Sequence, residues 1–322
     1  MRLFVTGGAG FIGSNLVRHL LASGDDEVTV FDALTYAGNP ANLADVESDP
    51  RFRFVHADIC DREAVAAAMA GHDAVLHLAA ESHVDRSLLD PDVFVRTNCG
   101  GTNVLCDVAV QVGVQRFLHV STDEVYGSIE QGSFREGDPL APRSPYSASK
   151  AGSDLLAMAY HETHGLPVVI TRSSNQYGPY QFPEKLIPFF TTRLLQGERV
   201  PLYGDGLNVR DWMFVEDNCE ALALVLRRGE VGEVYNIGAG NECTNREITD
   251  RLLALLGADE SSVEHVEDRL GHDRRYSIDT TKVAALGWAP AHDFDAALEA
   301  TVQFYRDRTD WWRPLQDRVR NR

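Results

Sequence analysis

The sequence predicts an α/β protein whose main part is a doubly wound parallel sheet and whose smaller, interleaved part is a mixed α/β lobe. Short runs rich in Val, Leu and Ile alternate with longer segments of helical periodicity in the first half of the chain. Runs that are apolar on both faces suit parallel strands covered by helices. The 322 residues exceed the usual size of one domain, which leaves room for the second lobe.

The elements of the sheet follow one another in the order that a doubly wound fold requires. Strands are expected at residues 3–6, 28–32, 52–57, 74–79, 117–121 and 168–172. Helices are expected between them at residues 12–22, 62–69, 92–111 and 146–164. This alternation places the carboxyl ends of the strands at one edge, which is where open α/β sheets bind their ligands.

The rhythm changes after residue 178, where prolines punctuate the chain and a second lobe is expected to begin. Further helices are expected at residues 188–196, 215–226, 245–256 and 294–307, and a strand that returns to the sheet at residues 234–237. We therefore assign residues 1–178 and about 211–238 to the sheet domain, and residues 179–210 and 239–322 to the second lobe.

The composition argues against several classes of partner. The chain has 48 acidic and 30 basic residues, and its formal net charge of -18 would repel a nucleic-acid backbone. The five cysteines are widely spread, so we expect reduced thiols in the cytoplasm and no metal site. The first strand runs into glycines too soon for a signal peptide, and no apolar run approaches the roughly 20 residues that span a bilayer. We expect no membrane partner.

A glycine-rich turn predicts a dinucleotide site. Gly7, Gly10 and Gly13 lie between the first expected strand and helix, where glycines permit a tight turn and bring a pyrophosphate close to the helix N-terminus. Asp32 ends the second strand, where its carboxylate can accept from ribose hydroxyls and would repel an extra 2′-phosphate. These features favour NAD over NADP. The alternative is a packing turn followed by an ordinary aspartate.

Two more strand ends carry residues that suit the same ligand. Asp58 closes the third strand and could accept from an adenine amino group. The small residues of Leu78-Ala79-Ala80 close the fourth strand and would let a cofactor lie against the backbone. Each segment could be a mere strand terminus, but their shared position at the carboxyl edge favours contact with a ligand.

Tyr146 and Lys150 lie four residues apart at the start of an expected helix, so both face the same way. A nearby ammonium and a nicotinamide cation would each favour the phenolate and lower the tyrosine pKa from about 10. Tyr146 is therefore expected to act as general base on a sugar hydroxyl. The spacing also recurs by chance, and the upstream glycine turn is what favours the catalytic interpretation.

An acidic pair follows another strand end. Ser121-Thr122 closes the strand, and Asp123 and Glu124 come next. Two neighbouring carboxyl groups repel each other as anions, so one can be held protonated as an acid while the other remains a base. Acid and base in one place indicate an elimination. The alternative is a solvated acidic loop.

These motifs resemble the extended short-chain dehydrogenase/reductase superfamily and, within it, the dTDP-glucose 4,6-dehydratase family, over nearly the whole chain. The resemblance implies that Tyr146 removes the C4 hydroxyl proton while NAD takes the C4 hydride. Glu124 then takes the C5 proton, Asp123 protonates the leaving C6 hydroxyl, and hydride returns to C6. Thr122 would bond the C4 oxygen, and Lys150 would orient the nicotinamide ribose. Further runs that carry the likeness are Tyr36-Ala37-Gly38-Asn39 and residues 78–87, 177–188, 201–206, 210–212 and 271–276.

The resemblance also implies two sets of binding residues. The cofactor contacts are Gly7, Gly10, Phe11, Ile12, Gly13, Asp32, Ala33, Leu34, Thr35, Asp58, Ile59, Leu78, Ala79, Ala80, Thr97, Tyr146, Lys150 and Gln176. The nucleotide-sugar contacts are Ser82, Thr122, Asn175, Lys185, Leu186, Pro201, Tyr203, Arg210, Asn245, Asp268, Arg269 and His272. Arg210 suits the diphosphate because its planar fork can pair with two phosphate oxygens; a surface arginine paired with Asp211 is the alternative.

Two departures from the family pattern leave alternatives open. Gln176 replaces an asparagine and keeps an amide on a longer stem, whereas Leu270 replaces a proline and frees the nucleotide loop. A 4,6-dehydratase of a UDP-, GDP- or CDP-hexose therefore stays open. A sugar-nucleotide 4-epimerase needs no acid pair, a decarboxylase has serine where Asp123 stands, and a non-catalytic nucleotide-sugar-binding protein needs neither acid.

Helices 92–111 and 146–164 resemble those through which relatives form homodimers.

Overall fold

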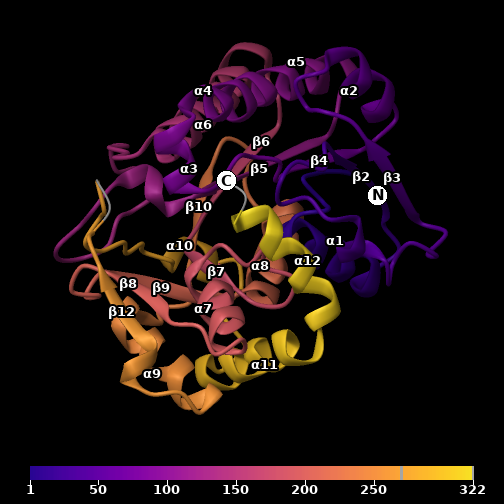
Figure 1. Cartoon of the computed structure of the whole chain (residues 1–322). Coiled ribbons are helices and arrows are strands. Elements are labelled where there is room, and N and C mark those ends of the chain that lie inside the picture. The colour runs from indigo at the N-terminus through magenta and orange to yellow at the C-terminus, as the bar shows by residue number, and fades with distance from the viewer. Residues whose placement is uncertain (269–270, 321–322) are drawn as a thin grey trace.

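A seven-stranded parallel sheet forms the centre of the part of the chain that the computed structural model describes, residues 1–268 and 271–320 (Figure 1). Its spatial order is β10-β6-β5-β4-β1-β2-β3, and every neighbouring pair is parallel. The predicted fold class is thereby confirmed. The strands are β1 (Arg2–Thr6), β2 (Glu27–Asp32), β3 (Phe52–His56), β4 (Ala74–His77), β5 (Arg116–Thr122), β6 (Val168–Ser173) and β10 (Val234–Ile237).

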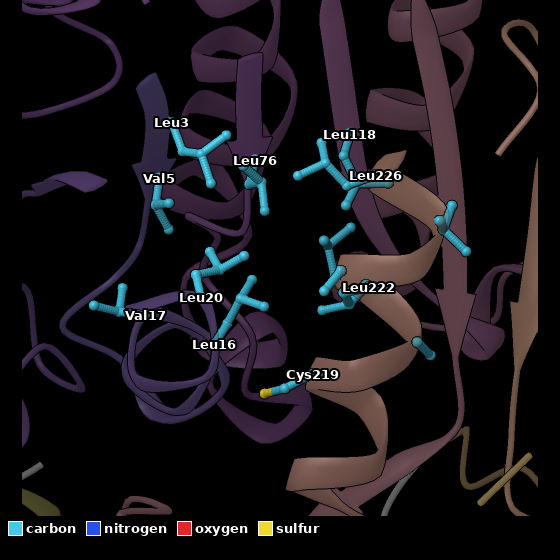
Figure 2. Packing of buried hydrophobic residues seen from close by; sticks show 14 of the residues in the cluster. Leu3, Val5, Leu16, Val17, Leu20, Leu76, Leu118, Cys219, Leu222 and Leu226 are labelled. Atoms are coloured by element: carbon cyan, nitrogen blue, oxygen red, sulfur yellow. The ribbon is translucent and has the colours of Figure 1, made fainter. Parts of the chain in front are cut away.

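Helices cover both faces of the sheet because successive strand residues point to opposite sides. The helices α1 (Phe11–Ser23) and α8 (Val215–Arg228) cover one face, and α2 (Arg62–Met69), α5 (Thr102–Val112) and α6 (Pro145–His164) cover the other (Figure 1). Burying one large aliphatic side chain contributes about 1.5–3 kcal/mol. Figure 2 shows the first layer, in which Leu16, Leu20, Leu222 and Leu226 of the helices face Leu3, Val5, Leu76 and Leu118 of the sheet.

The expected helix at 92–111 is wrong as a single element. The structure divides it into α4 (Pro91–Phe94), a π-helical segment at Val95–Gly101, and α5, and it adds α3 (Val84–Leu89) upstream. The wide turn places Asn98 inward, where its Nδ2 donates to the Glu81 carbonyl at 3.0 Å and to Ser149 Oγ at 2.8 Å. A π-helical turn of this kind is a local insertion that hydrophobic periodicity does not reveal.

A smaller mixed sheet lies beyond the carboxyl edge, as predicted. In the described chain it contains β7 (Asn175–Tyr177), β9 (Val209–Phe214) and β11 (Glu242–Thr244), beside the parallel pair β8 (Val200–Tyr203) and β12 (Val263–Val266). The helices α7 (Leu186–Leu194), α9 (Asn245–Leu256) and α11 (Phe294–Asp307) pack with it around a separate apolar cluster. The remaining α-helices of the described chain are α10 (Thr281–Ala284) and α12 (Thr309–Arg320). Strand β10 returns to the large sheet beside β6. The boundaries between the sheet domain and the second lobe stay a prediction.

Among helices in residues 1–268 and 271–320, none combines the length and apolarity needed to cross a membrane. The same part of the chain contains no cluster of three or more His, Cys, Asp or Glu side chains arranged to hold a metal ion.

Candidate active site

A cavity of about 480 Å³ lies at the carboxyl edge of the large sheet and extends to the second lobe. Its volume is typical of a small-molecule site. Nearly all of the predicted site residues that the structure describes line this cavity, from the glycine turn to Arg210. The exceptions are Leu34, which lines a neighbouring pocket, and Asp268, which pairs with His272 at 2.6 Å. Arg269 and Leu270 lie outside the described residues.

The glycine turn between β1 and α1 is a cradle that side chains would fill. A Cβ atom on Gly13 would lie 2.1 Å from the Gly7 carbonyl oxygen, and one on Gly7 would lie 2.6 Å from the backbone nitrogen of Ala79. Gly10 precedes α1 and has no side chain to cap it, so the N–H groups of the first turn remain available to an anion. These residues fit the pyrophosphate of a dinucleotide.

Asp32 is fixed at the cavity wall by two backbone donors. Its Oδ2 accepts from the N–H of Ala9 at 2.9 Å, and its Oδ1 accepts from the N–H of Leu34 at 2.8 Å. Burial raises the pKa of this carboxyl group. Each oxygen keeps a second lone pair, which can accept from a ribose hydroxyl. Leu34 thus acts through its backbone, and its own φ of 50° is left-handed.

Helix α6 presents Tyr146 and Lys150 to the cavity. A capping box between Ser144 and Ser147 starts the helix. The Tyr146 ring packs edge-on against Phe94, with centroids 6.3 Å apart, and Lys150 Nζ donates to the Val120 carbonyl at 2.8 Å. Burial lowers the pKa of Lys150 to about 8.

The expected lowering of the tyrosine pKa is wrong for the chain by itself. Burial, and after it the charge of Glu124, raise the pKa of Tyr146 above its ordinary value, while a hydrogen bond with Thr122 acts in the opposite direction. The reason is that the phenol lies in a closed environment beside a carboxylate, and burial disfavours the charged form. A positive charge close to the ring would oppose this shift and favour the phenolate.

The two acids after β5 occupy different environments. Asp123 is buried, and burial followed by the charge of Glu124 raises its pKa well above the ordinary value. Thr122 Oγ1 donates to Asp123 Oδ1 and accepts from the N–H of Glu124, both at 3.3 Å. Within the described residues, Asp123 Oδ2 has no hydrogen-bond partner. Asp123 is therefore placed to hold a proton and to donate it into the cavity.

Arg210 of β9 lines the same cavity. Its guanidinium carbon stands 4.1 Å from the Tyr276 ring centroid, and its Nη2 donates to the Asp273 carbonyl at 2.9 Å. Arg210 is only 4% exposed, which rules out the surface-arginine alternative. Asp211 instead accepts from the N–H of Asn241 at 2.8 Å.

Glu184 and Tyr276, for which the sequence predicts no role, also line the cavity. Tyr36 donates to Glu184 Oε1 at 2.9 Å, and burial raises the pKa of Glu184 to about 7. Glu184 directly precedes Lys185, which was assigned. Its acidic side chain, which with Lys185 separates Phe182-Pro183 from Leu186-Ile187, was the signal that could have identified it.

Replacing Glu184 by Gln is expected to flatten the dependence of stability on pH. Its folded-state pKa of about 7 exceeds the ordinary value of 4.5, so the stabilisation present below the unfolded pKa is lost as pH rises through the folded pKa. The loss is about 3 kcal/mol between pH 4.5 and 8. Urea unfolding at both pH values measures it. Exposed Glu230→Gln is the control, and equal losses in the wild type and Glu184→Gln would contradict the prediction.

Comparison with known proteins agrees with this site. The family model described as GDP-mannose 4,6 dehydratase matches residues 4–301. A dTDP-glucose 4,6-dehydratase of Streptomyces griseus is 59% identical over 97% of this chain and 96% of its own length. A low-salt glycan biosynthesis protein, Agl12, of Haloferax volcanii is 56% identical over 95% of this chain and 98% of its own.

Solved structures of similar proteins indicate the same family. DesIV of Streptomyces venezuelae, a dTDP-glucose 4,6-dehydratase crystallised with NAD and dTDP, has a TM-score of 0.97 and 58% identity, covering 98% of this chain and 100% of that one. The UDP-glucose 4-epimerase of Thermus thermophilus, with NAD, has a TM-score of 0.89 and 34% identity, covering 96% and 100%. Fold and site thus define an extended short-chain dehydrogenase/reductase. Within that class, the chain belongs to the dTDP-glucose 4,6-dehydratase family.

Proposed function

We propose that this chain converts dTDP-D-glucose to dTDP-4-keto-6-deoxy-D-glucose and water, with NAD as a cofactor that is restored in each turnover. The observation that carries the proposal is the buried Asp123, whose pKa is raised by burial and by the neighbouring Glu124, in the same cavity as Tyr146 and the glycine turn. An epimerase has no use for such an acid at C6. The family assignment and the 59% identity to a named dehydratase support the same substrate.

The bound dinucleotide would supply the hydride acceptor at C4 and the hydride donor at C6, together with a positive ring near Tyr146. Tyr146 takes the C4 hydroxyl proton, and Thr122 Oγ1 bonds the C4 oxygen. Lys150, held by Val120, orients the cofactor ribose. The positive ring offsets the burial that raises the tyrosine pKa.

The acid pair then performs the elimination. Glu124 takes the C5 proton, which the C4 ketone has made acidic, and Asp123 donates its proton to the C6 hydroxyl, which leaves as water. After C6 is reduced, Glu124 returns the proton to C5. Tyr146 ends the turnover protonated and Asp123 ends it ionised, so one proton passes from the tyrosine to the aspartate and restores the starting state.

Isotope tracing tests the proposed reaction. Purified protein is incubated with dTDP-glucose deuterated at C4, and the product is identified by mass and NMR; UDP-, GDP- and CDP-hexoses are compared. We expect deuterium at C6 of a 4-keto-6-deoxy sugar, with dTDP-glucose the preferred substrate. A C4 epimer of unchanged mass would favour the epimerase, and bound nucleotide without product would favour a non-catalytic protein.

We also propose that the protein is a cytoplasmic homodimer. Four exposed apolar side chains, which a second copy could remove from water, lie on α3, on α6 and on the π-helical segment, and both α3 and the π-helical segment contact α6: Leu88, Leu89, Val95 and Leu155. Among the described residues all five cysteines are free thiols, which suits a reducing compartment. Sedimentation of the wild type and of Leu155→Glu tests the dimer, since a charge at the contact should release monomers.

A further inference from the structure

The C-terminal helix α12 is tied to the glycine turn by a chain of hydrogen bonds that the proposed reaction does not use. Trp311 Nε1 donates to Asn42 Oδ1 at 2.8 Å. Asn42 Nδ2 donates to the Ala9 carbonyl at 2.9 Å. The N–H of Ala9 donates to Asp32 Oδ2, also at 2.9 Å. The chain of bonds therefore runs from α12 to the aspartate that we place against the cofactor ribose.

The two side chains in this link are closed off from water. Asn42 is 1% exposed and Trp311 is 5% exposed. A buried polar group that loses its partner gains no compensating bond from solvent. The Asn42 amide uses its acceptor toward α12 and its donor toward the turn. Cutting the Asn42–Ala9 bond leaves the Ala9 carbonyl with the N–H of Asn39 as its remaining donor, and cutting the Trp311–Asn42 bond removes the donor to Asn42 Oδ1.

Aromatic packing fixes Trp311 in place. Its ring lies edge-on to Tyr180, with centroids 5.7 Å apart, and 5.5 Å from the Phe304 centroid. The guanidinium of Arg18, on α1, stands 4.0 Å over the Tyr180 ring and also donates to the Asn42 carbonyl. Helix α1, which begins at the glycine turn, is thus held by the same cluster. Figure 1 shows α12, in yellow, on the side of the sheet where α1 lies.

We propose that Asn42 and Trp311 are positioning residues that retain the dinucleotide, because they hold the glycine turn and Asp32 in the conformation that binds it. This inference rests on the proposed function, since it takes NAD as the ligand of that turn. Release of the cofactor requires the turn to relax, and the link to α12 opposes this relaxation. Removing one buried hydrogen bond is expected to speed release about tenfold.

Trp311→Phe keeps an aromatic ring and removes the N–H donor. The neighbouring Trp312 offers a matched control: it is 1% exposed, and its Nε1 donates to the Tyr305 carbonyl at 2.6 Å, not to the turn. Trp312→Phe should lower the melting temperature of the cofactor-free protein about as much as Trp311→Phe does. It should leave the rate of cofactor release unchanged. Asn42→Asp breaks the other hydrogen bond of the link, because aspartate keeps an acceptor for the indole N–H of Trp311 but lacks the donor to the Ala9 carbonyl.

The experiment loads each full-length protein with NAD, displaces it with excess NADH and follows the exchange by fluorescence. We expect about tenfold faster release from Trp311→Phe and Asn42→Asp, wild-type release from Trp312→Phe, and recovery of Trp311→Phe turnover at saturating NAD. Equal release from Trp311→Phe and the wild type, or equal acceleration by both tryptophan variants, would overturn the inference. A wild type that binds no NAD would overturn the proposed function, and this inference with it.

Discussion

Tyr146→Phe is expected to lower kcat about 10³-fold, the contribution of a well-placed general base, while changing the affinity for the nucleotide sugar little. Phenylalanine keeps the ring that packs on Phe94 and removes only the oxygen that takes the C4 proton. Without that acceptor, hydride transfer from C4 would build up positive charge at C4. The loss should therefore appear in the first step, in which C4 of the sugar is oxidised and the cofactor is reduced, before any elimination.

A stopped-flow measurement of cofactor reduction, mixed with substrate in a single turnover, checks this expectation. Tyr126→Phe is the matched control, because Tyr126 is also buried but uses its hydroxyl structurally: it donates to Asn236 Oδ1 and accepts from Arg172 Nη1, both at 2.8 Å. That variant should lose stability and keep the rate of cofactor reduction. If Tyr146→Phe reduced its cofactor as fast as the wild type, the base would have to be another group.

The features that the sequence predicted well are those with a local signal. Val and Ile runs, the turn at Gly7 and the carboxylate of Asp32 each depend on a few neighbouring residues, and the doubly wound topology then brings distant strand ends to one edge. That is why residues as far apart in sequence as Gly7 and Asp123 could be placed in one cavity, whereas Arg210 was placed there by the family resemblance. The topology supplied the long-range information that the local pattern lacked.

The features that sequence did not reveal depend on burial and on distant contacts. The direction of the Tyr146 pKa was missed because spacing shows that Lys150 is near but not that the ring is closed off beside Glu124. Glu184 was missed because its buried partner, Tyr36, is 148 residues away. The link from Trp311 to Asn42 spans 269 residues, and no periodicity in either segment indicates it.

Asp123→Asn is expected to slow formation of the 6-deoxy product about 10²- to 10³-fold while sparing oxidation at C4. Burial and Glu124 raise the pKa of Asp123 and so favour its neutral form, and asparagine matches that form in charge and shape and keeps an acceptor for Thr122. What the variant lacks is a proton acidic enough to give to the departing hydroxyl. Reduced cofactor should therefore accumulate in a single turnover.

Exchange with heavy water separates the roles of the two acids. In Asp123→Asn the 4-keto intermediate persists beside an intact Glu124, so the base can remove and return the C5 proton, and deuterium should enter C5 of the unreacted sugar. In Glu124→Gln the same intermediate lacks the base, and C5 should stay protonated. Because both variants keep Tyr146, both should reduce the cofactor. Loss of cofactor reduction in Asp123→Asn would show that Asp123 acts at C4, and C5 exchange in Glu124→Gln would transfer the role of base to another residue.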